Sequence, residues 1–298
     1  MTPHAIDGRR WVAAALGEAR RGFTGIQEQA AGAARVAGFL RGALEFEPRP
    51  DDVFVATYPR SGTTWMQFIV HLLVSGGNFD FRHISDVSPW YERTLALGTR
   101  RASDFDRLPG PRVFKTHLIP EWLPNQGRFI HVHREGSAVV RSYYGLYRSH
   151  LGYSGSFDAF FRRFMEGRVQ YGSWFDHRRR WLRRTDGRVI HIRYESMEED
   201  LLRVVSTLAA FLRLDVPNEL RHQILQMATK RFMKTHEDRF DPITEHLIDR
   251  GFLARNFIAP DARTLGLTRD QEHMLLHQLQ RDTEPRSWKF LELPAFLH

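Results

Sequence analysis

A short apolar run, a glycine-containing turn and a second apolar run follow one another directly in this chain, and together they restrict its fold more than any other feature. Residues 53–58 read Val-Phe-Val-Ala-Thr-Tyr, and the stretch from Trp65 to Val74 is again largely apolar. A short apolar run bounded by turn residues is typical of a strand buried in a parallel sheet. We therefore expect a strand, a tight turn and a helix, in that order.

The alternation of strands and helices continues along the chain and predicts an α/β fold. Further strands are expected at 113–115, 128–133 and 189–194, and helices at 136–150, 197–212, 218–228 and 268–281. Such alternation indicates a P-loop-like three-layer sandwich, in which a central parallel sheet is flanked by helices. The segment 235–266 has little periodicity and is expected to form a long functional loop or lid.

The first 47 residues differ in composition from the rest and predict a helical N-terminal extension. They are rich in Ala and Arg, and the prolines at 48 and 50 end any helix there. The apolar face of the extension is thin, so we expect 1–47 to pack on the domain rather than to touch a membrane. Residues 48–298 are expected to form a single domain, a length that one large core can serve.

Composition excludes some kinds of site and leaves others open. The chain has no cysteine, which excludes a disulfide framework, a thiolate metal site and a cysteine nucleophile. Its net charge of +8 fits an anionic ligand, nucleic acid, a membrane surface or an ordinary basic surface, and charge alone does not choose among them. The longest apolar run near the N-terminus, residues 11–16, is far too short to cross a bilayer, so a cytoplasmic protein is expected.

The stretch 57–65, Thr-Tyr-Pro-Arg-Ser-Gly-Thr-Thr-Trp, predicts a phosphate-binding loop. Gly62 permits a tight turn, after which backbone N–H groups and the helix N-terminus face an anion. Hydroxyl donors and a positive charge come from Ser61, Thr63, Thr64 and Arg60. The loop is not a Walker A motif, because the chain contains no Gly-x4-Gly-Lys-Ser/Thr string. The plainer alternative is a strand–turn–helix junction with a Ser/Thr cap.

A second candidate stretch, Phe-Lys-Thr-His-Leu at 114–118, follows another predicted strand. Open α/β sheets bind ligands at the carboxyl ends of their strands. His117 is therefore a candidate general base, and Lys115, two residues earlier on the same strand face, is a candidate for stabilising charge in the transition state. A lone histidine among 15 is more often a surface or packing residue.

A third candidate pair is Arg134 and Ser142, an arginine at a strand end and a serine inside the next predicted helix. Such a pair can bind a phosphate. By spacing alone, a surface ion pair and a packed serine are the more common outcome.

These three stretches, in this order, resemble the signatures of the cytosolic sulfotransferase family, and we expect a bacterial member. The family's 5′-phosphosulfate loop reads Tyr-Pro-Lys-Ser-Gly-Thr-Thr-Trp, and this chain departs from it only at Arg60, which keeps the charge but does not donate a proton near neutral pH. Lys-Thr-His-Leu after a strand matches at Lys115 and His117. A strand, Arg, seven residues and Ser-Tyr-Tyr match at Arg134 and Ser142.

The resemblance implies a reaction and its components. The donor would be 3′-phosphoadenosine-5′-phosphosulfate (PAPS), the product 3′-phosphoadenosine-5′-phosphate (PAP), and no metal would be required. By in-line displacement the sulfuryl group would pass to a hydroxyl of a small, apolar or aromatic acceptor. His117 would take the proton, and Arg60, Lys115 and the loop amides would stabilise charge. Expected partners are a small-molecule hydroxyl acceptor and no nucleic acid, without stable membrane insertion, in a monomer or homodimer.

Further residues match the family more loosely. Trp65 and Tyr194 lie where the family contacts adenine, although either is as readily a core aromatic. The family's late Arg-Lys-Gly loop is matched only by Arg255 or, less well, by Arg250, and Lys230 replaces a family Phe near the adenine. Aromatic residues that we expect in the acceptor pocket, with His117, are Phe81, Trp90, Tyr144 and Tyr147.

Two other functions fit parts of the pattern. A nucleotide-dependent kinase of the P-loop class shares the strand, loop and helix, but the missing Gly-Lys-Ser/Thr and the Lys-Thr-His strand end argue against it. A non-catalytic nucleotide-binding protein on a degenerate sulfotransferase fold would suit the altered late loop, but not the retained His117 and Lys115. Magnesium dependence with ATP, or nucleotide binding without turnover, would identify each.

Overall fold

The computed structural model describes residues 33–240 and 265–281, and a four-stranded parallel sheet lies at their centre. The strands are β1 (Val53–Thr57), β2 (Val113–Thr116), β3 (Arg128–His133) and β4 (Val189–Arg193). Their order across the sheet is β2-β1-β3-β4, and every neighbouring pair is parallel. All four carboxyl ends therefore meet at one edge, and the predicted parallel sheet is confirmed.

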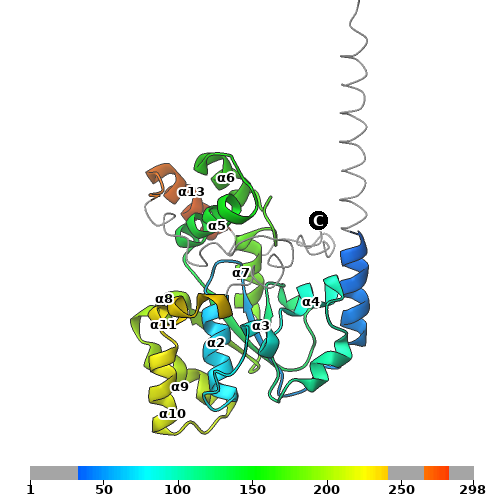
Figure 1. The fold of residues 1–298 in the computed structure, drawn as a ribbon. Helices are drawn as coiled ribbons and strands as arrows, with labels where there is room; N and C mark the ends of the chain where they lie inside the picture. The colour runs from blue at the N-terminus through cyan, green and yellow to red at the C-terminus, as the bar shows by residue number, and fades with distance from the viewer. Residues whose placement is uncertain (1–32, 241–264, 282–298) are drawn as a thin grey trace, which may run out of the picture.

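Helices cover both faces of the sheet (Figure 1). The longer ones are residues 33–45, α2 (Thr63–Val74), α5 (Gly136–His150), α6 (Phe157–Met165), α7 (Trp174–Arg183), α9 (Leu201–Leu212), α10 (Asn218–Met227) and α13 (Arg269–Arg281). The shorter ones are α3 (Ile84–Val87), α4 (Tyr91–Leu97), α8 (Tyr194–Glu199) and α11 (Lys230–Thr235), with 3₁₀ turns η1 (Ala102–Arg107), η2 (Pro120–Trp122) and η3 (Glu237–Arg239).

Two predicted boundaries were wrong. The last strand ends at Arg193, and Tyr194 is the first residue of α8 rather than the end of the strand. The helix predicted at 197–212 is interrupted at Asp200, whose side chain accepts a hydrogen bond from the backbone N–H of Arg203 and so starts α9. Aspartate favours this capping position because it satisfies an N–H that has no partner within the helix.

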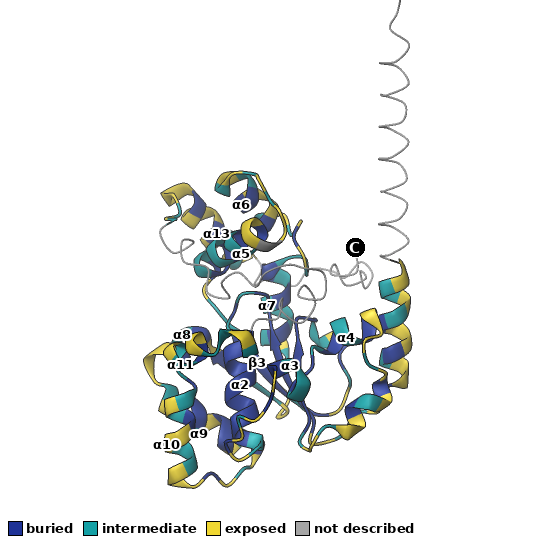
Figure 2. Ribbon diagram, in the orientation of Figure 1, coloured by how far each residue is buried: buried dark blue, intermediate teal, exposed yellow. Residues whose placement is uncertain are grey.

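Alternate residues of β1 enter two different cores, as strand geometry requires. Val53 and Val55 pack with α2, α9 and α10, whereas Phe54 and Ala56 pack with α4, the helix at 33–45 and Trp181 of α7. The helix at 33–45 contributes Phe39 to this second core, and Phe46 follows it there. Figure 2 shows β3 and α2 almost entirely buried. Strand β1 therefore packs against the helices on both faces of the sheet.

A third core lies beyond the carboxyl ends of the strands, where α5, α6 and α13 gather (Figure 1). It contains Tyr58, which directly follows β1, and aromatic residues of α5, α6 and α7. Among the described residues, 33–240 and 265–281, no helix is long and apolar enough to cross a membrane.

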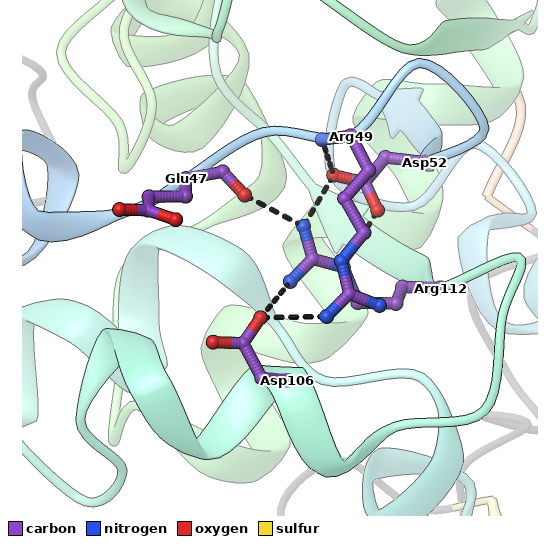
Figure 3. A network of polar contacts seen from close by, with 5 residues as sticks. All are labelled: Glu47, Arg49, Asp52, Asp106 and Arg112. Atoms are coloured by element: carbon purple, nitrogen blue, oxygen red, sulfur yellow. Dashed lines mark hydrogen bonds and ion pairs between the residues drawn. The ribbon is translucent and has the colours of Figure 1, made fainter.

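An ion-pair network closes the opposite edge of the sheet, where β1 and β2 begin (Figure 3). The guanidinium of Arg112 forms a bidentate pair with Asp52 at 2.7 Å for both bonds, and both side chains are fully buried. Arg112 also donates to Asp106 at 2.9 Å and to the Glu47 carbonyl at 2.8 Å. Arg49 donates to Asp106 at 2.8 Å. These contacts tie the entry to β1 to the entry to β2.

Candidate functional site

The turn between β1 and α2 has the shape that the sequence predicts for an anion-binding loop. Gly62 caps α2 with a φ of 87°, and Arg60 also has a positive φ, of 69°. A β-carbon at Gly62 would lie 2.5 Å from the Tyr194 ring, so only glycine fits there. Strained backbone of this kind concentrates at ligand sites.

Donors in this loop remain available to a ligand. The Ser61 hydroxyl is fully buried and has no hydrogen-bond partner among residues 33–240 and 265–281, and the same holds for the buried Nε atom of Arg134. Buried polar groups are normally paired, so two orphans beside one helix N-terminus indicate a missing acceptor. The chemistry of these donors, N–H and O–H groups with a guanidinium, fits an anion.

The two predicted phosphate-binding stretches lie in contact. Arg60 donates through Nε to the Ser142 hydroxyl at 2.9 Å, and Arg134 donates to the carbonyl of Arg60 at 3.0 Å. The Arg134 guanidinium also lies 4.1 Å from the centre of the Tyr194 ring. The structure thus brings together residues that are 82 positions apart in the chain.

The imidazole of His117 contacts Thr57, the last residue of β1 before this turn. Its Nδ1 atom is 2.8 Å from the backbone carbonyl of Thr57 and 3.2 Å from the Thr57 hydroxyl. A carbonyl only accepts, so Nδ1 carries the proton and Nε2 has the free lone pair. Burial, followed by the charge of Lys115, lowers the pKa of His117 well below its usual value. The imidazole is therefore neutral near pH 7, the form that a general base requires.

Lys115 and Trp90 lie beside this imidazole. The Lys115 ammonium is 3.8 Å from the centre of the Trp90 ring, and the Trp90 and His117 rings meet edge to face at 5.1 Å. Tyr171 contacts the same imidazole at 5.0 Å between ring centres, and it has a positive φ of 67°. The sequence analysis did not select Tyr171, and the one available signal was its place before Gly172 in a loop.

Comparison with known proteins agrees with this geometry. A model of the sulfotransferase domain matches residues 50–251. The chain belongs to the sulfotransferase family. It is 32% identical over 204 residues to sulfotransferase 1 family member D1 of Mus musculus, across 63% of this chain and 68% of the relative. It is 33% identical over 210 residues to human sulfotransferase 4A1, across 64% of this chain and 74% of the relative. The predicted family is confirmed, and a bacterial origin stays a prediction.

Solved structures share the fold of this sulfotransferase domain. Mouse sulfotransferase SULT7A1 complexed with PAP matches with a TM-score of 0.64 at 22% identity, over 83% of this chain and 88% of the other. Retinol dehydratase in complex with androsterone and the inactive cofactor PAP matches with a TM-score of 0.66 at 20% identity, over 85% and 88%. At these identities the likeness confirms the predicted fold class.

Trp65 and Tyr194, the two aromatic residues predicted near adenine, lie together in the sulfotransferase domain. Their rings meet at 5.9 Å, and the Trp65 indole donates to the Ala228 carbonyl at 2.7 Å. Lys230 lies over both rings, at 5.4 Å from Trp65 and 5.3 Å from Tyr194, and forms an ion pair with Glu198. The Lys230 ammonium therefore lies against the Trp65 and Tyr194 rings, and the Tyr194 ring is next to Gly62.

The fold does not bring the residues predicted for the acceptor pocket together in one place. Trp90 contacts His117, whereas Phe81 packs against Phe68 and Phe79 in the core behind α2. Tyr144 and Tyr147 are buried against Phe160 of α6. The predicted late-loop residues Arg250 and Arg255 lie outside the described residues, as does most of the predicted loop at 235–266.

Proposed function

We propose that this sulfotransferase transfers the sulfuryl group of PAPS to a hydroxyl of a small, apolar or aromatic acceptor, with His117 as general base. The observation that carries the proposal is the bond from His117 Nδ1 to the Thr57 carbonyl, which leaves Nε2 unprotonated beside the anion-binding loop. Thr57 belongs to the anion-binding loop, and its carbonyl also orients the His117 ring. A proton acceptor would therefore lie next to the transferable group.

Donor binding is assigned to the residues around Gly62. The orphaned Ser61 hydroxyl and the backbone amides at the start of α2, with Thr63 and Thr64, would hold the 5′ end of the nucleotide. Arg134 and Ser142 would hold the 3′-phosphate, and Trp65 and Tyr194 would contact the adenine. The PAP bound to mouse SULT7A1, a protein of the same fold, supports this choice of donor.

The transfer balances as a single displacement. The acceptor oxygen forms a bond to sulfur while the bond from sulfur to the 5′-phosphate oxygen breaks, and the electron pair of that bond leaves with PAP. The acceptor proton passes to Nε2 of His117. Lys115 and Arg60 stabilise the charge on the sulfuryl and leaving oxygens, because fixed cations in a buried site act strongly on developing charge.

Aromatic surface beside the base supports an apolar or aromatic acceptor. Trp90 and Tyr171 stack with ring centres 6.4 Å apart, and both rings contact His117. A flat apolar wall next to a base suits a ring that carries a hydroxyl.

The test of this function is turnover of ³⁵S-labelled PAPS with a panel of 2-naphthol, a steroid alcohol and a sugar, after a thermal-shift measurement with PAP and with ATP. We expect PAP to stabilise the protein, ATP to have little effect, and label to move to an organic hydroxyl. Nucleotide binding without any transfer would contradict the proposal, as would magnesium-dependent phosphoryl transfer from ATP.

Two substitutions separate binding from transfer. His117→Ala removes the base and Lys115→Met removes a cation, so each should lower kcat by about 100-fold to 1,000-fold. PAP should stabilise His117→Ala as it does the wild type, because His117 is not among the proposed phosphate contacts, whereas Lys115→Met also removes a cation beside the leaving phosphate oxygen and should weaken that stabilisation. His222→Ala and Lys234→Met, at exposed positions, are the matched controls. Unchanged turnover in His117→Ala would remove it as the base.

The remaining proposals concern organisation. We propose that residues 48–298 form a single domain with 1–47 as a helical extension. Its packed end is visible in Phe39, which is buried against Tyr91. A cytoplasmic location and a monomer or homodimer stay predictions.

A further inference from the structure

The carboxyl group of Glu92 is one of the few acids that the fold buries completely. Glu92 is the second residue of α4, and its side chain has no exposure to solvent. A buried carboxyl group is costly unless it is hydrogen-bonded, so its partners show what it does. The salt bridges among the described residues do not include it, which sets it apart from the buried Asp52.

The partners of Glu92 are two parts of the transfer site. Its Oε1 atom accepts a hydrogen bond from the backbone N–H of His117 at 2.9 Å and another from the indole Nε1–H of Trp90 at 2.6 Å. His117 carries the proposed base, and Trp90 is the ring on which the Lys115 ammonium lies. One oxygen atom of Glu92 therefore contacts both the backbone of His117, the proposed base, and the Trp90 ring on which the Lys115 ammonium lies.

The backbone reinforces this connection. The N–H of Lys115 donates to the Pro89 carbonyl at 2.9 Å, and Trp90 forms an isolated parallel bridge to Lys115. Residues 89–90 therefore pair alongside β2, near its carboxyl end. Glu92 holds the end of this segment against His117, two residues beyond Lys115. A side chain locked by such contacts keeps its neighbours within the narrow geometry that catalysis needs.

Burial raises the pKa of Glu92, and the hydrogen bonds from Trp90 and from the His117 N–H act in the opposite direction. The charged and titratable groups near it include Lys115 and His117 from the β2 side, Tyr91 and Arg93 on α4, and Tyr171, whose pKa burial raises well above its usual value. The bonds from Trp90 and from the His117 N–H both end on Oε1, and an amide oxygen can accept the same two bonds. Side-chain contacts with Thr116 and Tyr171 also act on the carboxyl group.

We propose that Glu92 is a positioning residue for sulfuryl transfer, whose Oε1 atom sets the relative placement of the His117 imidazole and of the Trp90 ring that carries Lys115. The inference rests on the proposed function. Glu92 touches neither the phosphate loop nor the Arg134–Ser142 pair, so its influence falls on the transfer step and not on donor binding.

The test compares Glu92→Ala and Glu92→Gln with wild type in PAPS turnover, using the fastest acceptor among 2-naphthol, the steroid alcohol and the sugar. Glu92→Ala should lower kcat by about 10-fold to 100-fold, because a displacement of about 1 Å at a reacting group has effects of that size. The Kd for PAP and the KM for PAPS should stay within about twofold of wild type. Glu92→Gln should restore most of kcat, since its amide oxygen accepts both bonds.

The outcomes separate this inference from the proposed function. Glu219→Ala, at an exposed position on α10, is the matched control and should behave as wild type. If wild type and control transfer sulfate and Glu92→Ala does so at the same kcat, the positioning role is wrong and the proposed function stands. If wild type transfers nothing, both fall. A Glu92→Gln variant as slow as Glu92→Ala would also contradict the inference, because the acceptor oxygen would then not be what matters.

A milder variant covers the case in which Glu92→Ala does not fold. Glu92→Asp keeps the carboxylate but shortens the side chain by one methylene, so it cannot reach the His117 N–H and the Trp90 indole together. With PAP binding and the circular dichroism spectrum as measures of folding, a folded Glu92→Asp should lose about 10-fold in kcat. Full kcat in this variant would overturn the proposal.

Discussion

The polar groups at the amino ends of the strands (the amino edge) and at their carboxyl ends (the carboxyl edge) differ in whether they are hydrogen-bonded. At the amino edge, Arg112 makes four hydrogen bonds and forms a buried bidentate pair with Asp52. At the carboxyl edge, the buried Ser61 hydroxyl and the Arg134 Nε atom have no partner in the part of the chain that the structure describes. The same strands, β1 and β2, pass through both edges.

This difference supports the proposal that the ligand binds at the carboxyl edge. A buried group without a partner costs free energy in the free protein, and that cost is recovered only when an acceptor arrives. At the amino edge, the charged groups of Arg112 and Asp52 are already paired with each other and are not available to a ligand. We therefore expect substitutions at the amino edge to change stability without changing transfer, and substitutions at the carboxyl edge to change donor binding or transfer.

The largest expected effect is at the amino edge. Asp52→Ala leaves the Arg112 guanidinium buried and unpaired, which should lower the free energy of unfolding by about 3–5 kcal/mol. Chemical denaturation measures this loss. Asp106→Ala, at a position with a half-exposed side chain, should cost much less. Folded Asp52→Ala should keep the kcat of wild type, and a kcat that falls in step with stability would contradict the separation of the two edges.

At the carboxyl edge, Gly62→Ala should remove donor binding. Alanine at a positive φ costs about 1–2 kcal/mol, and its β-carbon would also meet the Tyr194 ring at 2.5 Å. Gly76→Ala is the matched control, because Gly76 has a φ of 66° but nothing within 4 Å of an added β-carbon. We expect both variants to lose stability and only Gly62→Ala to lose the thermal shift with PAP. Equal PAP shifts in the two variants would show that the loop tolerates a side chain.

Acid pH should affect folding before it affects the base. Burial lowers the pKa of His177 to about 3, whereas an unfolded histidine titrates at about 6.5. The unfolded chain therefore binds more protons below about pH 6.5, and stability should fall by about 1.4 kcal/mol per pH unit for this residue. The lowered pKa of His117 should keep kcat flat until the pH is below 6.5. Urea unfolding and kcat measured from pH 8 to 5 test both. An acid limb of kcat above pH 6.5 would contradict the assignment of the buried imidazole.

The smallest effect concerns the orphaned hydroxyl. Ser61→Ala removes one donor to the nucleotide and should raise the Kd for PAP about fivefold, or about 1 kcal/mol, while the free protein becomes no less stable. Ser88→Ala removes another buried hydroxyl without a partner among the described residues, at a position outside the 57–65 loop, and should leave the Kd unchanged. Calorimetric titration with PAP would measure both. A Ser61→Ala variant that binds PAP as wild type would mean that this hydroxyl faces no ligand.

Much of the donor side could be predicted because it is local in sequence. The loop at 57–65 is one continuous stretch, and Gly62, the strand before it and the helix after it follow from residue type and spacing alone. The acceptor side could not be predicted in the same way. Tyr171 and Glu92 reach His117 from separate loops and helices, and Phe81, Tyr144 and Tyr147 look equally suitable in sequence although the fold packs them among other aromatic residues.

The sequence by itself determined the alternation of strands and helices, the glycine turn of the proposed phosphate loop, and the placement of a lysine and a histidine at a strand end. Only the tertiary structure decided that the Thr57 carbonyl orients the His117 ring, that Arg60 donates to the Ser142 hydroxyl, and that Glu92 accepts from the His117 N–H. The reason is physical. Turn geometry and hydrophobic periodicity are properties of neighbouring residues, whereas the hydrogen bonds of a buried side chain depend on which distant segments the core brings against it.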